Sequence, residues 1–238
     1  MAYQFYPCAV TRIIDETKHV KRFFIRKPQD IPFQFKAGQF VMLDLPIDSR
    51  ITNRSYSIAS PPDDSDEFEL VISENPTGLG TQYLFKEVKE GTVLQVSKEL
   101  GKFFLPAEID ADICFLCTGT GIAPFRSQLY DLFKRNIPRK NLYLVFGNRW
   151  EKDILYHKEL KQFAEQHSEF HFYPVLSRDN PGWTGKKGYV HPVFEELFAD
   201  KRPAYFYLCG WAGMLKEARE RIEAMGYDRK RIRFEAYD

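Results

Sequence analysis

Residues 113–125, ICFLCTGTGIAPF, run from an apolar strand pattern through two glycines into a helix pattern. Gly119 and Gly121 lack a Cβ atom, so the backbone can turn sharply there and approach a ligand closely. Pro124 suits the first turn of a helix. A helix N-terminus presents free N–H groups and a partial positive charge, which favour phosphate. The third glycine of the dinucleotide fingerprint is missing, so a phosphate-binding loop and an ordinary strand–helix turn both fit.

From residue 113 onward, apolar strand patterns alternate with helix patterns. Such alternation is typical of a parallel sheet covered by helices, which binds ligands at the carboxyl ends of its strands. We expect strands at 113–117, 142–146, 170–176, 205–208 and 231–236, and helices at 123–134, 157–166, 192–198 and 213–225.

The residues before this region show short strand patterns separated by turns, which is typical of an antiparallel barrel. We expect strands at 8–15, 20–26, 39–45, 54–58, 68–73 and 93–97, with one helix at 80–88. The fold class is therefore β plus α/β in two domains. Residues 1–105 form a six-stranded antiparallel Greek-key barrel, and residues 106–238 form a five-stranded parallel sheet with helices on both faces.

Composition excludes several classes of protein. The 34 Lys and Arg residues against 33 Asp and Glu residues give a formal net charge of +1, which argues against a nucleic-acid-binding protein. The sequence contains no apolar run of about 18 residues, and its start shows no secretory signal pattern. We expect a cytoplasmic monomer without a membrane span.

The cysteines and histidines do not indicate a metal site. Cys114 and Cys117 form a C-x-x-C, but positions i and i+3 of a strand point to opposite faces, so we expect both to fill the core. The spacing of a plant-type iron–sulfur centre is absent. The five histidines show no metal-ligand spacing.

A second motif, Arg54-Ser55-Tyr56-Ser57, lies in the barrel half. Alternation places Arg54 and Tyr56 on one strand face, where they could hold a phosphate and a planar ring, although an ordinary edge strand fits equally well. Several further motifs follow in order, namely Gly78-Leu79-Gly80-Thr81, Gly101-Lys102-Phe103, Gly119 to Pro124, Cys209-Gly210 and Glu235-Ala236-Tyr237. Together they resemble the ferredoxin–NADP+ reductase family of flavoproteins, in a single-chain form without an iron–sulfur domain.

The resemblance implies that the barrel binds FAD. Arg54 is then expected at the FAD pyrophosphate, Tyr56 along the isoalloxazine ring and Ser57 near flavin N5. Phe103 is a further candidate for contact with the flavin. The residues implied for FAD are Arg54, Ser55, Tyr56, Ser57, Val71, Ile72, Ser73, Gly78, Gly80 and Thr81.

The same resemblance implies that the second domain binds the nicotinamide nucleotide, through Thr118, Gly119, Thr120, Gly121, Pro124, Cys209 and Gly210. Cys209 is either a group beside the nicotinamide or a small buried hydrophobe. Tyr237 is expected to cover the flavin, and Glu235 to act as a polar relay. The chain departs from the family pattern by one extra residue, Asp238. The expected catalytic residues are Ser57, Cys209, Glu235 and Tyr237.

A group of cations favours NADPH over NADH, although NADH is possible. In family members that use NADPH, a Ser-Arg pair followed by Lys and Tyr holds the 2′-phosphate. Ser177, Arg178, Lys187 and Tyr189 match this pattern. A solvated basic loop is the alternative interpretation.

The resemblance implies a reductase that passes a hydride from NADPH to FAD and then electrons to a small acidic carrier, a ferredoxin or a flavodoxin. Lys98, Lys102, Arg229 and Lys230 could attract such a partner. Alternatives are the reductase component of an oxygenase system, a reductase of free flavin, and a non-enzymatic nucleotide-binding subunit.

Overall fold

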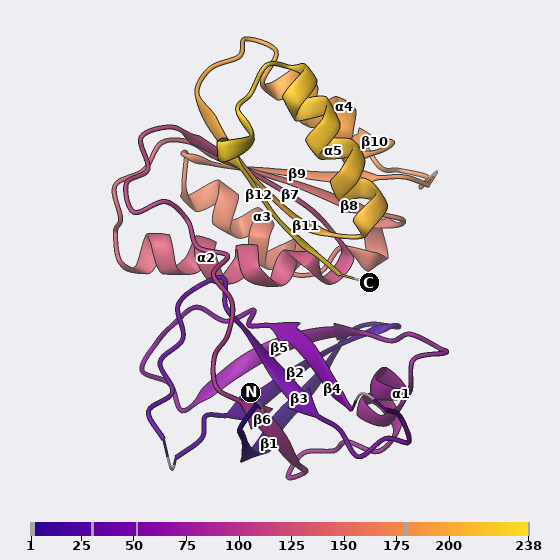
Figure 1. The fold of residues 1–238 in the computed structure, drawn as a ribbon. Coiled ribbons are helices and arrows are strands. Elements are labelled where there is room, and N and C mark those ends of the chain that lie inside the picture. The colour runs from indigo at the N-terminus through magenta and orange to yellow at the C-terminus, as the bar shows by residue number, and fades with distance from the viewer. Residues whose placement is uncertain (1–2, 30, 51, 179, 238) are drawn as a thin grey trace. The chain divides into compact units, whose positions relative to one another are not determined.

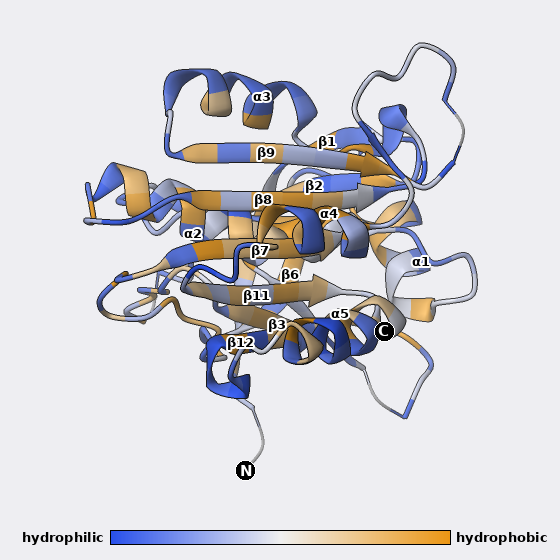
Figure 2. Cartoon of the chain, turned by 90° about the horizontal axis from the view of Figure 1, so that it is seen from above, coloured by the Kyte–Doolittle hydropathy of each residue, from blue (hydrophilic) through white to orange (hydrophobic). Residues whose placement is uncertain are grey.

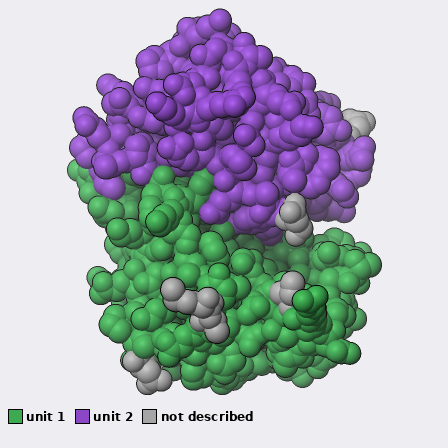
Figure 3. All heavy atoms as spheres, in the orientation of Figure 1, with its two compact units in different colours: residues 1–104, 123–136 green, residues 105–122, 137–238 purple. Residues whose placement is uncertain are grey.

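The structure is a computed structural model that describes residues 3–29, 31–50, 52–178 and 180–237, so Asp238 lies outside the described residues. The chain divides into two compact units, coloured separately in Figure 3. Unit 1 contains residues 1–104 and 123–136. Unit 2 contains residues 105–122 and 137–238.

Unit 1 contains the expected antiparallel sheet of six strands. The strands are β1 (Phe5–Thr17), β2 (Val20–Arg26), β3 (Phe40–Asp44), β4 (Asn53–Ser57), β5 (Glu67–Ser73) and β6 (Val93–Ser97), and a short helix, α1 (Leu79–Lys86), follows β5. Their order is β4-β3-β6-β1-β2-β5. A bridge between Ile58 and Leu70 joins the two outer strands, and the N–H of Ala59 donates to the carbonyl of Glu69 at 2.8 Å. The sheet therefore closes as a barrel.

The barrel core explains the sequence pattern of its strands. Phe23, Ile25, Leu43 and Phe68 are completely buried side chains of one apolar cluster. Because alternate residues of a strand point to opposite faces, these strands place one apolar row inside the barrel and leave a mixed row outside.

Unit 2 contains a parallel sheet of six strands in the order β10-β9-β8-β7-β11-β12. Its strands are β7 (Asp112–Thr118), β8 (Leu142–Asn148), β9 (Phe170–Leu176), β10 (Lys186–Lys187), β11 (Ala204–Gly210) and β12 (Ile232–Ala236). The sequence predicts five of them. The sixth, β10, consists of two lysines that pair with Val175 and Leu176, and such a strand carries no apolar pattern to reveal it.

Helices lie on both faces of this sheet. In Figure 1, α4 (Val190–Leu197) and α5 (Ala212–Ala224) lie on one face, and α3 (His157–Gln166) lies on the other. Figure 2 shows mainly hydrophobic colour along β7 and β8, as expected for strands covered twice. Cys114 belongs to the apolar cluster with α4 and α5, whereas Cys117 lies outside that cluster, so the two thiols fill opposite sides of the sheet. No helix within the described ranges is long and apolar enough to cross a membrane.

The glycine turn forms a short 3-10 helix, η1 (Gly119–Gly121), which leads into α2 (Ile122–Lys134). From Ala123 onward, α2 belongs to unit 1. The hydroxyl of Ser127 donates to the carbonyl of Ser60 at 2.7 Å, and the side-chain amide of Gln128 donates to the carbonyl of Phe103 at 2.5 Å. These bonds hold α2 on the barrel.

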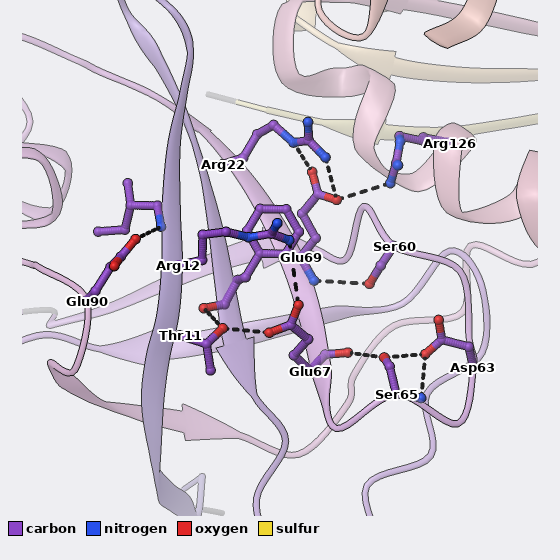
Figure 4. Close-up of polar contacts among 12 residues, drawn as sticks. Thr11, Arg12, Arg22, Ser60, Asp63, Ser65, Glu67, Glu69, Glu90 and Arg126 are labelled. Carbon is purple, nitrogen blue, oxygen red and sulfur yellow. Dashed lines mark hydrogen bonds and ion pairs between the residues drawn. The ribbon is translucent and has the colours of Figure 1, made fainter.

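A buried carboxylate forms the third anchor of α2 (Figure 4). Glu69 on β5 is 2% exposed and is paired with Arg22 of β2, at 2.5 Å from Nε, and with Arg126 of α2, at 3.2 Å from Nη1. Arg126 also donates to the carbonyl of Ala59 at 2.9 Å. Removing one member of a buried ion group is costly because it leaves an uncompensated charge behind.

We therefore expect Glu69→Ala to lower the free energy of unfolding by about 3–5 kcal/mol, as measured by urea denaturation. The control is Asp15→Ala. The carboxylate of Asp15 is exposed and lies 3.8 Å from Lys21, so its loss is expected to cost about 0–1 kcal/mol. Equal losses of unfolding free energy in the two variants would contradict the role of Glu69 as a buried anchor of α2.

Candidate functional site

Arg54 and Tyr56 lie on the same face of β4, opposite Leu43 and Val41 of β3. The ring of Tyr56 packs against the barrel core. Burial raises the pKa of Tyr56 to about 12, and the positive charge of Arg54 opposes this shift. Tyr56 therefore presents a neutral phenol ring.

The two serines of this motif differ in exposure. Ser55 is exposed, whereas Ser57 is buried at the end of β4, with 6% of its surface exposed. Ser57 lies opposite Phe40 in the β3–β4 register. The motif thus places an arginine, a ring and a buried hydroxyl within four residues of one strand.

Arg54 also lies against the first turn of α1. A Cβ atom on Gly80 would lie 3.0 Å from Cγ and 3.3 Å from Nε of Arg54, so the glycine leaves room for this close approach. The helix has no side-chain cap at Gly78 and no acidic residue in its first turn. A guanidinium beside the positive end of a helix is a favourable place for an anion. The residues present therefore fit the pyrophosphate of FAD.

The hydroxyl of Thr81 shapes this helix start. It accepts a hydrogen bond from the N–H of Asn75 at 3.0 Å, and it lies 3.2 Å from the carbonyl of Gly78. Asn75 in turn accepts from the N–H of Thr77 at 3.1 Å. The hydroxyl of Thr81 thus closes the turn that precedes α1 and fixes where the first helical N–H groups point.

Val71, Ile72 and Ser73 form the end of β5. They pair with β2 on one side, and the bridge from β5 to β4 is at Leu70. The side chain of Ile72 is part of the barrel core. Among the described residues, the bridge to the end of β4 lies at Leu70, so the edge of Val71–Ser73 that faces away from β2 is suited to backbone hydrogen bonds with a planar ligand.

Phe103 lies in a different environment. It is 5% exposed, and its ring centroid is 5.8 Å from that of Phe125 on α2. This contact gives the ring a packing role under α2.

In unit 2, the ends of β7 and β11 touch at two glycines. A Cβ atom on Gly121 would overlap the carbonyl of Cys209, and one on Gly210 would overlap the hydroxyl of Thr118. Gly210 has a φ of +134°, which side chains rarely tolerate. These backbone contacts bring Thr118, Gly119, Thr120 and Gly121 beside Cys209 and Gly210 at the carboxyl edge of the sheet, while Pro124 is the third residue of α2.

Cys209, Glu235 and Tyr237 also meet at this edge. Cys209 lies opposite Glu235 in the β11–β12 register, and the N–H of Tyr237 donates to the carbonyl of Gly210 at 2.9 Å. Burial raises the pKa of the Cys209 thiol, and the charge of Glu235 raises it further, so Cys209 is a neutral thiol. Burial also raises the pKa of Glu235 to about 7. This carboxyl group can therefore gain or lose a proton near neutral pH.

The predicted phosphate-binding residues cluster at the ends of β8, β9 and β10. The N–H and hydroxyl of Ser177 donate to the carbonyl of Asn148, at 3.0 and 3.3 Å. Lys187 lies opposite Leu176, the residue before Ser177. Arg178, Lys187 and Tyr189 are exposed, and the ring of Tyr189 follows at the start of α4.

Sequence reasoning missed Arg149 in this cluster. Its carbonyl accepts from the N–H of Arg178 at 3.2 Å, so two arginines lie at the carboxyl ends of neighbouring strands. The signal was present, because Arg149 directly follows the apolar run of β8.

Two of the cations predicted to attract a partner protein, Arg229 and Lys230, lie at the other edge of the sheet. They precede the amino end of β12, the end opposite Glu235, and Arg229 pairs with Glu223 at 2.8 Å.

Two family models match this chain. Residues 7–105 match the oxidoreductase FAD-binding domain, and residues 115–220 match the oxidoreductase NAD-binding domain. These matches define an oxidoreductase whose cofactors are FAD and a nicotinamide nucleotide. The chain is 35% identical over 213 residues to ferredoxin–NADP reductase B of Sorangium cellulosum, covering 87% of this chain and 86% of that protein. The chain belongs to the ferredoxin–NADP reductase family.

Other relatives extend the comparison. The chain is 33% identical over 230 residues to a glycine betaine monooxygenase reductase subunit of Pseudomonas aeruginosa, covering 95% of this chain but only 62% of that subunit. A structure of the Amycolatopsis cytochrome P450 reductase GcoB superposes with a TM-score of 0.88 at 26% identity, covering 99% of this chain and 71% of that one. A Neisseria gonorrhoeae ferredoxin NADP+ reductase with bound FAD and NADP has the same fold, with a TM-score of 0.84 at 23% identity and 99% of both chains covered.

The raised pKa of Glu235 predicts a pH dependence. Since the folded state holds this proton up to about pH 7 and an unfolded Glu loses it near pH 4.5, the folded state binds more protons between these values. The difference in free energy of unfolding between wild type and Glu235→Gln should therefore fall as pH rises from about 4.5 to about 7. Carbon NMR of labelled glutamate should show a titration near pH 7 that Glu235→Gln lacks. A midpoint near 4.5 would contradict the burial of this group.

Proposed function

We propose that this protein is an FAD-containing reductase that oxidises NADPH and delivers electrons to a small acidic carrier protein of the ferredoxin or flavodoxin kind. The proposal rests on one observation, the contact of the Arg54 side chain with the first turn of α1. The guanidinium and the helix start together offer an anion site on the same strand as the ring of Tyr56. In this assignment FAD binds within residues 1–105 and the nicotinamide nucleotide within residues 106–238. When bound, these cofactors supply the redox chemistry, in which a hydride passes from nicotinamide to flavin and electrons then leave singly.

The chain supplies placement and proton handling. Arg54 and the N–H groups of α1 hold the pyrophosphate, and Tyr56 provides a flat face for a ring. Ser57 offers a buried hydroxyl as a hydrogen-bond donor. The backbone of Val71, Ile72 and Ser73 offers further donors and acceptors.

At the carboxyl edge of unit 2, the turn at Gly119–Gly121 receives the second pyrophosphate. Cys209 presents a neutral thiol there, as a small group against a nicotinamide ring. Glu235 holds a proton on its carboxyl oxygen near neutral pH and can exchange it. Tyr237 provides a second ring to cover a flavin.

The spectrum of the purified protein tests this proposal. We expect a flavin absorbance band that bleaches on anaerobic addition of NADPH and returns with an added ferredoxin or flavodoxin. A preparation that binds no FAD, even when FAD is added, would overturn the proposal. A flavin that NADPH does not bleach would indicate a non-enzymatic nucleotide-binding subunit.

Oxygenase components are a second class of candidate electron acceptor, because the chain matches subunits named as monooxygenase reductases. The same assay tests them. The two classes differ in the protein that restores the oxidised spectrum. Reoxidation by a small carrier supports the main proposal, and reoxidation by an oxygenase component alone supports the second.

The cations at the ends of β8 and β9 predict a preference for NADPH. The 2′-phosphate adds about two negative charges near neutral pH. Arg178→Ala should therefore raise the KM for NADPH about tenfold to a hundredfold and leave that for NADH nearly unchanged, as steady-state kinetics would show. Arg149→Ala should act in the same direction. Arg229→Ala, which removes a guanidinium from the amino end of the sheet, is the control, and equal effects on both nucleotides would refute the assignment.

A further inference from the structure

The chain directly after Ser57 is fixed by its backbone N–H groups to neighbouring strands of the barrel. The N–H of Ile58 donates to the carbonyl of Gln39 at 3.0 Å, and the N–H of Ala59 donates to the carbonyl of Glu69 at 2.8 Å. Ile58 and Ala59 are completely buried. A buried backbone carbonyl also needs a donor, because water does not reach it. The carbonyl side of this segment therefore depends on groups from elsewhere in the fold.

Helix α2 supplies those donors. Nη1 of Arg126 donates to the carbonyl of Ala59 at 2.9 Å, and the hydroxyl of Ser127 donates to the carbonyl of Ser60 at 2.7 Å. Ser127 is completely buried, and 11% of the Arg126 side chain is exposed. A hydrogen bond from a charged donor is about twice as strong as one between neutral groups, so Arg126 is the stronger of the two anchors. All four residues lie in unit 1.

A buried carboxylate holds the same guanidinium nitrogen in place. Nη1 of Arg126 lies 3.2 Å from Oε2 of Glu69, whose Oε1 accepts from Nε of Arg22 (Figure 4). Because the backbone carbonyl of Glu69 accepts from the N–H of Ala59, these bonds form a closed ring through Ala59, Glu69 and Arg126. The ring fixes the position of Ala59 relative to β5.

Ser57 lies two residues before Ala59, and its hydroxyl is the donor expected near flavin N5. The chain between them passes through Ile58, whose side chain is part of the barrel core. A displacement of Ala59 is therefore passed on to Ser57 rather than absorbed by the residue between them. A misplacement of about 1 Å at a reacting centre can cost about a hundredfold in rate.

We propose that Arg126 is a positioning residue, which holds the Ala59 carbonyl and thereby directs the Ser57 hydroxyl toward flavin N5. The proposal rests on the proposed function and deepens it, because it gives a part in the flavin reaction to a side chain that is not among those assigned to either cofactor. Ser127 supports the same segment one residue further along.

The first experiment observes the flavin and needs no nucleotide. The protein is loaded with FAD that is isotopically labelled at N5, and nitrogen NMR then reports the hydrogen bond at that atom. Ser57→Ala should shift the N5 resonance. Arg126→Met, which keeps an unbranched side chain without the donor, should shift it in the same direction. In the Ser57→Ala background, Arg126→Met should add no further shift, because the hydroxyl that it positions is gone.

The second experiment measures flavin reduction by NADPH in a stopped-flow instrument. Arg126→Met should slow this step by about tenfold and leave the KM for NADPH nearly unchanged, because it disturbs the placement of a reacting group and not the nucleotide site. Arg126→Lys retains a charged donor and should recover most of the rate. In the Ser57→Ala background, the tenfold effect of Arg126→Met should disappear.

Two further variants decide the question if Arg126→Met fails to fold, since that change leaves the carboxylate of Glu69 with less compensating charge. Glu69→Gln combined with Arg126→Met removes one charge of each sign and leaves Arg22 paired with Glu16 at 3.4 Å. Ser127→Ala removes the neighbouring donor without changing any charge. Both variants should shift the N5 resonance in the same direction as Ser57→Ala.

Arg135→Met is the matched control, because it removes a cation from the same helix. Arg135 is 65% exposed and pairs with Asp131 at 3.1 Å, so its loss leaves the segment after Ser57 untouched. We expect the N5 resonance and the reduction rate of this variant to match those of the wild type.

An effect of Arg126→Met that persists in full in the Ser57→Ala background would overturn the proposal, because Arg126 would then act by another route. An N5 resonance that moves in neither Ser57→Ala nor Arg126→Met would overturn it as well. A wild-type flavin that NADPH does not reduce would instead refute the proposed function, while the N5 measurements would still decide the role of Arg126.

Discussion

The carboxyl edge of the parallel sheet depends on two positions where a side chain has no room. Gly121 brings the turn after β7 against the carbonyl of Cys209, and Gly210 brings the end of β11 against the hydroxyl of Thr118. Any side chain at either place would push the two strand ends apart. Because β12 is aligned on β11, the same contact fixes where Glu235 and Tyr237 lie relative to the turn after β7.

Burial then determines the chemistry of the groups gathered there. Cys209 and Glu235 are neighbours in the β11–β12 register, and desolvation favours the neutral form of each. The Cys209 thiol therefore stays protonated near neutral pH, whereas the Glu235 carboxyl group titrates near pH 7. Two adjacent groups in one environment thus differ in protonation near neutral pH because their intrinsic pKa values differ.

Sequence reasoning recovered the parts of the fold that local patterns encode. Short strand patterns between turns located the strands of unit 1, and apolar runs between helix patterns located five strands of unit 2. It missed β10, because Lys186 and Lys187 are strand residues only through their pairing with β9. It also missed the contacts of α2 with the barrel, since Arg126 and Ser127 meet partners 57 and 67 positions away.

The same limit applies to the candidate site, whose motifs are visible in the sequence but whose contacts are not. The motif containing Arg54 and Tyr56 is visible in the sequence, but the approach of Arg54 to Gly80 depends on how β4 and α1 pack. The register that joins Cys209 to Glu235 likewise required the structure. Arg149 and Arg178 lie in two loops that meet only in the fold, and loops carry no periodic signal from which their proximity could be read.

The path of the chain between the two units has a consequence for dissecting this protein. The chain crosses between units three times, after residues 104, 122 and 136, so neither unit is a continuous segment. A barrel fragment cut after residue 105 would leave Glu69 without Arg126 and Phe103 without Phe125. A fragment that begins at residue 106 would carry an α2 whose anchoring side chains have lost their partners. A cut at this boundary therefore removes native packing partners from unit 1, and neither fragment corresponds to one compact unit.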